Sequence, residues 1–132
     1  MNRAARILSL VAASMLCAAT ALATTTAQPT GGDADHGKTV YARCAACHDL
    51  NTGKTVLGPS MKGIVGRKAG AMPGFAYSPA LQASAVVWTP ASLDAYIAAP
   101  TRFVPGTNMA FAGLPDARDR ADLIAFLQQA AR

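Results

Sequence analysis

"CAACH", residues 44–48, constrains the interpretation of this sequence more than any other stretch. It places Cys44 and Cys47 three residues apart and follows them at once with His48. On one helical turn, two thiols at this spacing can reach the two vinyl groups on one edge of a porphyrin, and C-x-x-C-H is typical of haem c attachment. The residue after the second thiol then lies beneath the metal. The motif therefore predicts one covalent haem c, attached through Cys44 and Cys47, with His48 as a ligand of its iron.

Two other interpretations of these cysteines are weaker. A zinc site needs four ligands, and the available donors are Cys44, Cys47, His48 and His36. Zinc is disfavoured because adjacent residues such as Cys47 and His48 rarely bind one tetrahedral ion well. A thioredoxin-like redox pair would need a βαβ context, which the sequence does not predict. His36 is then expected to be an exposed residue in the first turn of a helix.

The N-terminus carries the pattern of an exported protein. Arg3 and Arg6 form a basic region, an apolar run begins at Ile7, and "ALA" at residues 21–23 is a small-x-small cleavage site. This pattern is typical of a secretory signal peptide. Since this kind of haem attachment occurs outside the cytoplasm in bacteria, we predict a periplasmic protein whose signal peptide is cleaved near Ala23.

The domain organisation follows from that cleavage. We predict a signal peptide over residues 1–23, a flexible leader over residues 24–32 and one domain over residues 33–132. An uncleaved anchor helix over residues 7–23 is the alternative, at the short limit of a membrane span. After cleavage we expect no stable membrane insertion and a monomer of 109 residues.

The charge of the chain is mildly positive. Loss of Arg3 and Arg6 with the signal peptide lowers the net charge from +5 to about +3, and all seven acidic residues are Asp. No run of Lys or Arg and no alternation of basic and aromatic residues is present. This composition argues against nucleic-acid binding, but it allows electrostatic steering toward an acidic protein partner.

Local signals predict a small number of helices. Asp33 is a good N-cap for a helix over residues 33–48. Thr89 followed by Pro90 predicts a helix over residues 89–100, ended by Pro100. Asp116 caps a last helix with Arg132 in its final turn, and its apolar face comprises Leu123, Ile124, Phe126 and Leu127.

The rest of the chain has little regular structure. Residues 49–87 are rich in Gly and Pro, with at most a short helical piece over residues 60–65. A mature chain of 109 residues with four to five short helices has only a small hydrophobic core. We therefore predict an all-α fold in which short helices and long loops are wrapped around one covalently bound haem.

The second axial ligand is expected to be a methionine. In "FVPGTNMAF", residues 103–111, the Pro-Gly pair at the centre of residues 104–107 predicts a type II turn that aims a nearby side chain inward. Met109 is therefore the favoured ligand, with Met61 as the fallback, although Met61 is also a plausible core filler. Met72 is expected in a surface loop.

His/Met ligation would limit the chemistry of the site. A thioether favours Fe(II) and raises the reduction potential. Because both axial positions would be occupied, one-electron transfer is favoured over oxygen or peroxide chemistry. The sequence thus predicts a carrier and not an enzyme.

Several separated motifs together resemble one family. The chain is similar to class I cytochrome c, close to the mitochondrial type and to bacterial cytochromes c2 and c550, over about residues 32–131. The resemblance rests on Trp88 and on the motifs "CAACH", "LGPSMKGIVGRKAG", "PGFAYS", "PGTNMAF" and "RADLIAFL". It implies the class I cytochrome c fold and an electron-transfer function.

The resemblance also implies roles around the two axial ligands. Pro59 would offer its carbonyl to the second ring nitrogen of His48 and so fix the orientation of the ring. Tyr96 would approach the sulfur of Met109. Phe111 would pack on the exposed edge of the haem.

A second set of implied roles concerns the haem propionates. Arg67, Tyr77 and Trp88 would surround the buried propionate, because a permanent cation and two donors let a carboxylate stay ionised away from water. Thr107 would form a hydrogen bond near the other propionate.

The resemblance further implies that the first helix crosses the last at Gly37, against Leu123 and Phe126.

Two positions depart from the family pattern. Leu81 stands where mitochondrial relatives carry Asn, and Asn108 stands where relatives carry a docking Lys just before the Met ligand. Part of the basic docking ring would remain in Lys38, Lys54, Lys62 and Arg102.

The function expected from all of this is electron transfer without catalysis. The leading hypothesis is a soluble periplasmic carrier of single electrons between respiratory or other redox enzymes with acidic docking surfaces. The alternative is a dedicated haem c subunit of a single dehydrogenase or oxidase complex. A haem enzyme or sensor with a labile Met109 is a third hypothesis.

Overall fold

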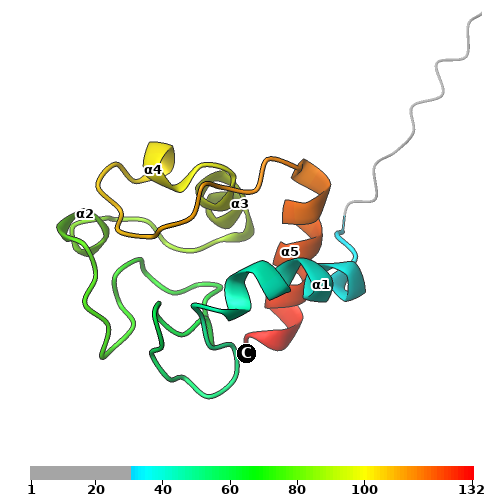
Figure 1. Ribbon diagram of the computed structural model, residues 1–132, viewed down its shortest axis with the longest axis horizontal. Helices are drawn as coiled ribbons and strands as arrows, with labels where there is room; N and C mark the ends of the chain where they lie inside the picture. Colours follow the sequence, from blue (N-terminus) through cyan, green and yellow to red (C-terminus); the bar gives the residue numbers. More distant parts are fainter. Residues whose placement is uncertain (1–30) are drawn as a thin grey trace, which may run out of the picture.

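The computed structural model describes residues 31–132, so the predicted signal peptide over residues 1–23 and most of the leader lie outside the described residues. Within the described part the chain is helical and has only one isolated β-bridge, between Lys68 and Val87, which confirms the all-α prediction. None of the helices in this range has the length and apolar content needed to cross a membrane. The helices are α1 (Ala34–Ala45), α2 (Pro79–Gln82), α3 (Pro90–Ala98), α4 (Pro100–Phe103) and α5 (Ala117–Ala130) (Figure 1).

Helices α1 and α5 cross on one side of the molecule, and the long loops lie on the other (Figure 1). The crossing point is Gly37, where any added Cβ would collide with the backbone oxygen of Asp122 and would lie 2.8 Å from Phe126 Cβ. Glycine therefore lets the backbones of the two helices come close together at this point. Its low helix propensity, which costs roughly 1 kcal/mol relative to Ala, is outweighed by this close packing.

The crossing is sealed by apolar and aromatic side chains. Leu123 and Leu127 of α5 are each only 1% exposed, and Val40 of α1 is 5% exposed. The rings of Tyr41 and Phe126 lie 5.6 Å apart, which is within the range of a favourable aromatic pair. Burial of each such side chain contributes roughly 1.5–3 kcal/mol, so this region has a core of its own.

A polar contact that the sequence did not predict joins the same two helices. His36 is exposed, as expected, but its Nδ1 lies 2.8 Å from the Asp122 carboxylate, whose side chain is almost fully buried. The backbone N–H of Asp33 donates to the other oxygen of that carboxylate over 2.7 Å. The start of α1 is thereby fixed to α5.

Capping residues set the helix starts as predicted. The Asp33 carboxylate accepts from two backbone N–H groups of the first turn of α1. Thr89 and Ser92 form a reciprocal capping box at the start of α3. Asp116 accepts from the N–H groups of Arg118 and Asp119 at the start of α5.

Some predicted helix ends were wrong. Helix α1 ends at Ala45, not at residue 48, because the N–H groups of Cys47 and His48 both donate to the Cys44 carbonyl and tighten the chain into a turn. Pro100 ends α3, but it also begins the short helix α4. Arg132 lies beyond the end of α5, where its Nε donates to the Gln128 carbonyl.

Two predictions for the loops also need correction. Residues 60–65 form turns and no helix, because Gly63 has a φ of +64° and its N–H donates to the Ala131 carbonyl at the end of α5. The sequence did not predict α2, which begins where Ser78 Oγ accepts from the N–H of Leu81 and Pro79 occupies the first helical position.

Candidate haem site

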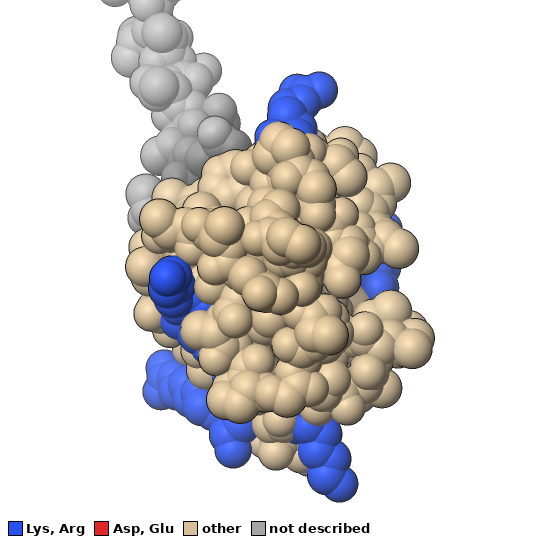
Figure 2. All heavy atoms as spheres, turned by 90° about the vertical axis from the view of Figure 1, so that its left-hand side faces the viewer, with Lys and Arg blue, Asp and Glu red and all other residues tan. Residues whose placement is uncertain are grey.

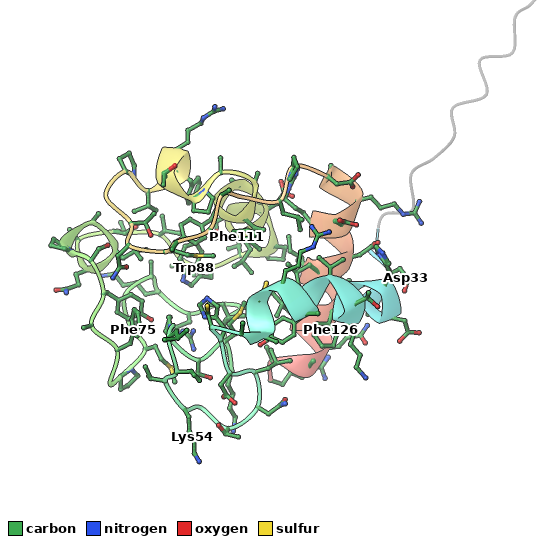
Figure 3. All side chains as sticks on the ribbon, in the orientation of Figure 1. Asp33, Lys54, Phe75, Trp88, Phe111 and Phe126 are labelled. Atoms are coloured by element: carbon green, nitrogen blue, oxygen red, sulfur yellow. The ribbon has the colours of Figure 1, made fainter. Side chains whose placement is uncertain are left out.

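The loops enclose an apolar cavity of about 380 Å³ on the side of the molecule away from the N-terminus of α1. This volume lies in the roughly 300–1,000 Å³ range of ligand and cofactor pockets. Figure 3 shows Trp88 and Phe111 in the upper half and Phe75 in the lower half of this region. Further apolar side chains from several elements complete the lining: Leu57, Met61, Ile64, Leu81, Leu93, Tyr96, Ile97, Met109 and Leu123.

The last turn of α1 brings both cysteines to this cavity. Cys44 is partly buried, Cys47 is exposed, and both line the cavity. Both sulfurs are free of a disulfide, so each is available for a thioether bond. Burial raises the pKa of the Cys44 thiol, although Arg43 opposes this shift.

The orientation of His48 is fixed by the loop that follows it. Its Nδ1 lies 2.8 Å from the Pro59 carbonyl oxygen. Because a carbonyl only accepts, Nδ1 must carry the proton, which leaves the lone pair of Nε2 free to bind a metal. The structure thus gives Pro59 the contact that the family resemblance implies for it.

Gly58 lets the loop approach the imidazole closely. A Cβ at this position would lie only 2.6 Å from His48 Cε1 and 2.8 Å from Nδ1. The Gly58 N–H donates to the Cys47 carbonyl over 2.7 Å. A side chain here would push the ring away from Pro59, so Gly58 is a site residue that the sequence analysis missed. Its adjacency to Pro59 was the available signal.

Met109 reaches the cavity from the loop between α4 and α5. The N–H of Thr107 donates to the Val104 carbonyl over 3.0 Å and Gly106 has a φ of +88°, which is the predicted type II turn. Met109 is half-buried and lines the cavity. In Figure 1 its loop passes above the region that the His48 loop bounds from below.

Tyr96 and Thr107 support the Met109 loop together. The Tyr96 hydroxyl and Thr107 Oγ1 are 2.9 Å apart, and the same Oγ1 accepts from the Met109 N–H over 3.3 Å. Burial raises the pKa of Tyr96, so its hydroxyl stays neutral. Tyr96 is therefore linked to the Met109 backbone through the Thr107 hydroxyl, and its approach to the Met109 sulfur stays a prediction.

Arg67, Tyr77 and Trp88 all line the same cavity. The Arg67 guanidinium donates to the carbonyls of Ser60 and Lys62 over 2.7 Å each, which holds it in place. Burial raises the pKa of Tyr77 and lowers that of Arg67, but a guanidinium remains protonated in proteins. These three side chains form a cationic and donor-rich patch in an otherwise apolar wall.

The other two methionines of the domain, and the two positions that depart from the family pattern, differ in how they lie relative to the cavity. Met61 and Met109 line the cavity, whereas Met72 does not and instead accepts a contact from Arg67 at its sulfur. Leu81 is 5% exposed and lines the cavity as part of the core. Asn108 is exposed at the cavity rim.

The residues present fit a haem c. The cavity wall is apolar, two free thiols lie at one rim, and His48 Nε2 and the Met109 thioether are soft or borderline donors suited to iron. The cationic patch around Arg67 suits a propionate. By contrast, no group of three or more His, Cys or acidic side chains among residues 31–132 is arranged to hold a metal ion by itself, and His36 is paired with Asp122.

Comparisons with known proteins agree with this chemistry. The Cytochrome c family matches residues 34–131. Cytochrome c2 of Rhodoblastus acidophilus is 48% identical over 99 residues, which cover 74% of this chain and 92% of that protein. Cytochrome c type-1 of Ascaris suum is 46% identical over 99 residues, which cover 74% of this chain and 88% of that protein.

A solved structure extends the similarity to three dimensions. Cytochrome cH from Methylobacterium extorquens is 43% identical, with a TM-score of 0.70 over 74% of this chain and 98% of that chain. The match to the family spans α1 to α5 and includes the motif at residues 44–48. This chain therefore belongs to the cytochrome c family, with its class I fold, and is an electron carrier with covalently bound haem c.

Proposed function

We propose that this protein is a soluble periplasmic carrier that passes single electrons between redox enzymes. Haem c would be attached through Cys44 and Cys47, and its iron would be held by His48 and Met109. The observation that carries the proposal is that one apolar cavity brings together both cysteines, a histidine with a free Nε2 and a methionine sulfur. When bound, haem c supplies an iron that changes its oxidation state by one electron.

Residues around the cavity would keep the one-electron change at the iron reversible. The apolar wall excludes water from the metal, and Met109 favours the reduced state. Arg67 would balance the charge of a buried propionate. With His48 and Met109 both bound, no position is left for a substrate, so we expect no catalysis. Rapid binding of carbon monoxide by the native reduced protein would contradict this.

The distribution of charge supports docking to an acidic partner. Five acidic residues cap α1 and α5 or lie in their first two turns: Asp33, Asp35, Asp116, Asp119 and Asp122. Asp94 of α3 is paired with Arg120 over 2.7 Å, and Asp49 accepts from the N–H groups of its own loop. The side of the molecule away from α1 and α5 carries basic side chains around an uncharged centre (Figure 2).

The mouth of the cavity has the character of a transient interface. Cys47 and Leu57 both line the cavity and lie in the loop that follows α1; Cys47 is exposed, and Leu57 is 75% exposed. Lys54 projects from this loop (Figure 3). A central apolar patch with basic neighbours suits a partner whose own electron-transfer site is apolar and has an acidic rim.

Electron transfer at two ionic strengths tests the docking. Lys54→Glu should slow electron transfer to periplasmic redox enzymes several-fold at low salt, and the difference should shrink at high salt because ions screen exposed charges. Arg118→Glu is the matched control, since Arg118 is 77% exposed but lies on α5 at the acidic end. Equal effects of the two variants would contradict the proposed docking surface.

The proposed location rests on the N-terminal pattern. We expect the protein purified from the periplasm to begin at Thr24, which N-terminal sequencing or mass measurement would show. A chain that keeps residues 1–23 and sediments with membranes would overturn the soluble form and favour the anchor. Stoichiometric purification with one dehydrogenase or oxidase would favour a dedicated subunit instead.

A further inference from the structure

Tyr41 is a buried polar residue that does not line the haem cavity. Its side chain lies in α1, three residues before Cys44, and is only 9% exposed. The hydroxyl donates to the His48 carbonyl oxygen over 2.7 Å. A phenylalanine would fill the same space without this bond, so the hydroxyl itself requires an explanation.

The bond completes the fixation of His48. The His48 N–H donates to the Cys44 carbonyl over 2.9 Å, and the ring Nδ1–H donates to the Pro59 carbonyl over 2.8 Å. Among the described residues, the only donor to the His48 carbonyl is Tyr41. Backbone N–H, backbone carbonyl and imidazole are thus each held by a different partner.

The Tyr41 ring is in turn held by the helix crossing. It packs against Phe126 of α5 with ring centroids 5.6 Å apart. Phe126 lies beside Gly37, where a Cβ would collide with the backbone of α5. The Tyr41 side chain therefore joins the helix crossing to the backbone of the proposed iron ligand.

We propose that Tyr41 is a positioning residue for the haem iron ligand, acting through the carbonyl of His48. By holding the peptide that follows His48, it keeps the imidazole aligned so that Nδ1–H reaches Pro59. That hydrogen bond raises the basicity of the ligand. The inference rests on the proposed ligation by His48. It adds a residue outside the haem cavity that would influence the reduction potential of the haem iron.

The test uses the haem-loaded protein and the variant Tyr41→Phe, which keeps the ring. Loss of the bond should speed solvent exchange of the His48 Nδ1 proton, observed by NMR in the reduced state, by roughly ten-fold. The reduction potential should rise, because a weaker Nδ1–H bond to Pro59 makes the imidazole a poorer donor to Fe(III). Phe126→Leu is the control: it loosens the same packing and should lower thermal stability without changing either readout.

The outcomes separate this inference from the proposed function. If Tyr41→Phe is destabilised like Phe126→Leu but keeps its exchange rate and potential, Tyr41 is merely structural and the inference is wrong. If the variant does not fold, the wild-type protein still tests it: the Tyr41 hydroxyl proton should be protected from exchange and lie close to His48, and a freely exchanging hydroxyl would overturn the inference. Failure of ligation itself would appear in the wild type as iron without a histidine ligand.

Discussion

The helix crossing and the loops around the cavity are stabilised in different ways. At the crossing, Gly37 lets two backbones meet, and Val40 and Leu127, which do not line the cavity, are only 5% and 1% exposed. Around the cavity, apolar side chains such as Leu93 and Ile64 face a space that the polypeptide does not fill. The helix crossing thus has a hydrophobic core of its own, whereas the loops form a wall around a cavity.

This difference assigns separate tasks to the two regions. The crossing forms a rigid base that positions the cysteines at the end of α1. The loops position His48 and Met109 through hydrogen bonds and turns, and we expect these loops to depend on the haem for their packing. Damage to the crossing should therefore reduce stability, whereas damage to the loops should mainly change the redox properties.

Loss of haem attachment should have the largest effect, because the loops around the cavity would lose the group against which they pack. Cys44→Ala combined with Cys47→Ala should give a chain without covalent haem, and we expect it not to fold cooperatively. Far-UV circular dichroism during thermal unfolding, with a haem stain on a denaturing gel, measures both effects. A well-folded apoprotein with a sharp transition would show that the loops need no haem.

The next largest effect is expected at the proposed ligand in the upper loop. Met109→Ala should lose the weak sulfur-to-iron absorption band at the red end of the oxidised spectrum. The potential should fall on the order of 0.1 V or more, a part of the roughly 0.8 V range over which axial ligands tune haem. Met61→Ala is the control, because Met61 lines the same cavity. Survival of the band in Met109→Ala and its loss in Met61→Ala would reverse the assignment.

A change at the crossing should cost stability and leave the potential unaltered. In Gly37→Ala the new Cβ would overlap the backbone of α5 at Asp122, which cannot give way as a side chain can. We expect a loss of about 1–3 kcal/mol in the free energy of unfolding, measured with denaturant in the haem-loaded protein. Gly31→Ala is the control, since nothing lies within 4 Å of that position. An equal loss in both variants would argue against the close approach.

The smallest expected effect depends on pH. The Asp33 N–H, helped by His36 and Arg118, lowers the pKa of the Asp122 carboxyl below its ordinary value despite burial. Folding then favours the charged form, so this stabilisation is fully present above about pH 4, the ordinary value, and is lost as pH falls through the lower folded pKa.

Asp122→Ala should accordingly lose about 1–3 kcal/mol near neutral pH, because the Asp33 N–H loses its acceptor. The difference from wild type should narrow in acid. Denaturant unfolding at several pH values measures this. A gap of constant size down to pH 2 would show that the carboxylate charge has no part in joining the helices.

The sequence was most informative where the responsible interactions are local. The capping of α1, α3 and α5 by Asp33, Thr89 and Asp116 follows from side chains that bond to their own first turns. The Pro-Gly turn before Met109 is equally local. The class I fold was predicted from the family motifs. Residues 49–87 show no hydrophobic periodicity from which it could have been predicted.

The sequence was least informative where distant residues meet. His36 and Asp122 are 86 positions apart, so their hydrogen bond leaves no local pattern. Helix α2 is a single turn whose start depends on Ser78. The bond from Tyr41 to the His48 carbonyl is closer in sequence, but it depends on how the turn after α1 folds back, which helix rules do not describe.

X-ray absorption at the iron edge tests the proposed ligation by His48 and Met109, because it counts sulfur and nitrogen neighbours of the metal. For the oxidised wild-type protein we predict one sulfur, from Met109, with His48 and the porphyrin supplying only nitrogen. In Met109→Ala the sulfur should be gone while the nitrogen shell stays. A wild-type iron without sulfur, or a sulfur neighbour that persists in Met109→Ala, would show that Met109 is not the second axial ligand.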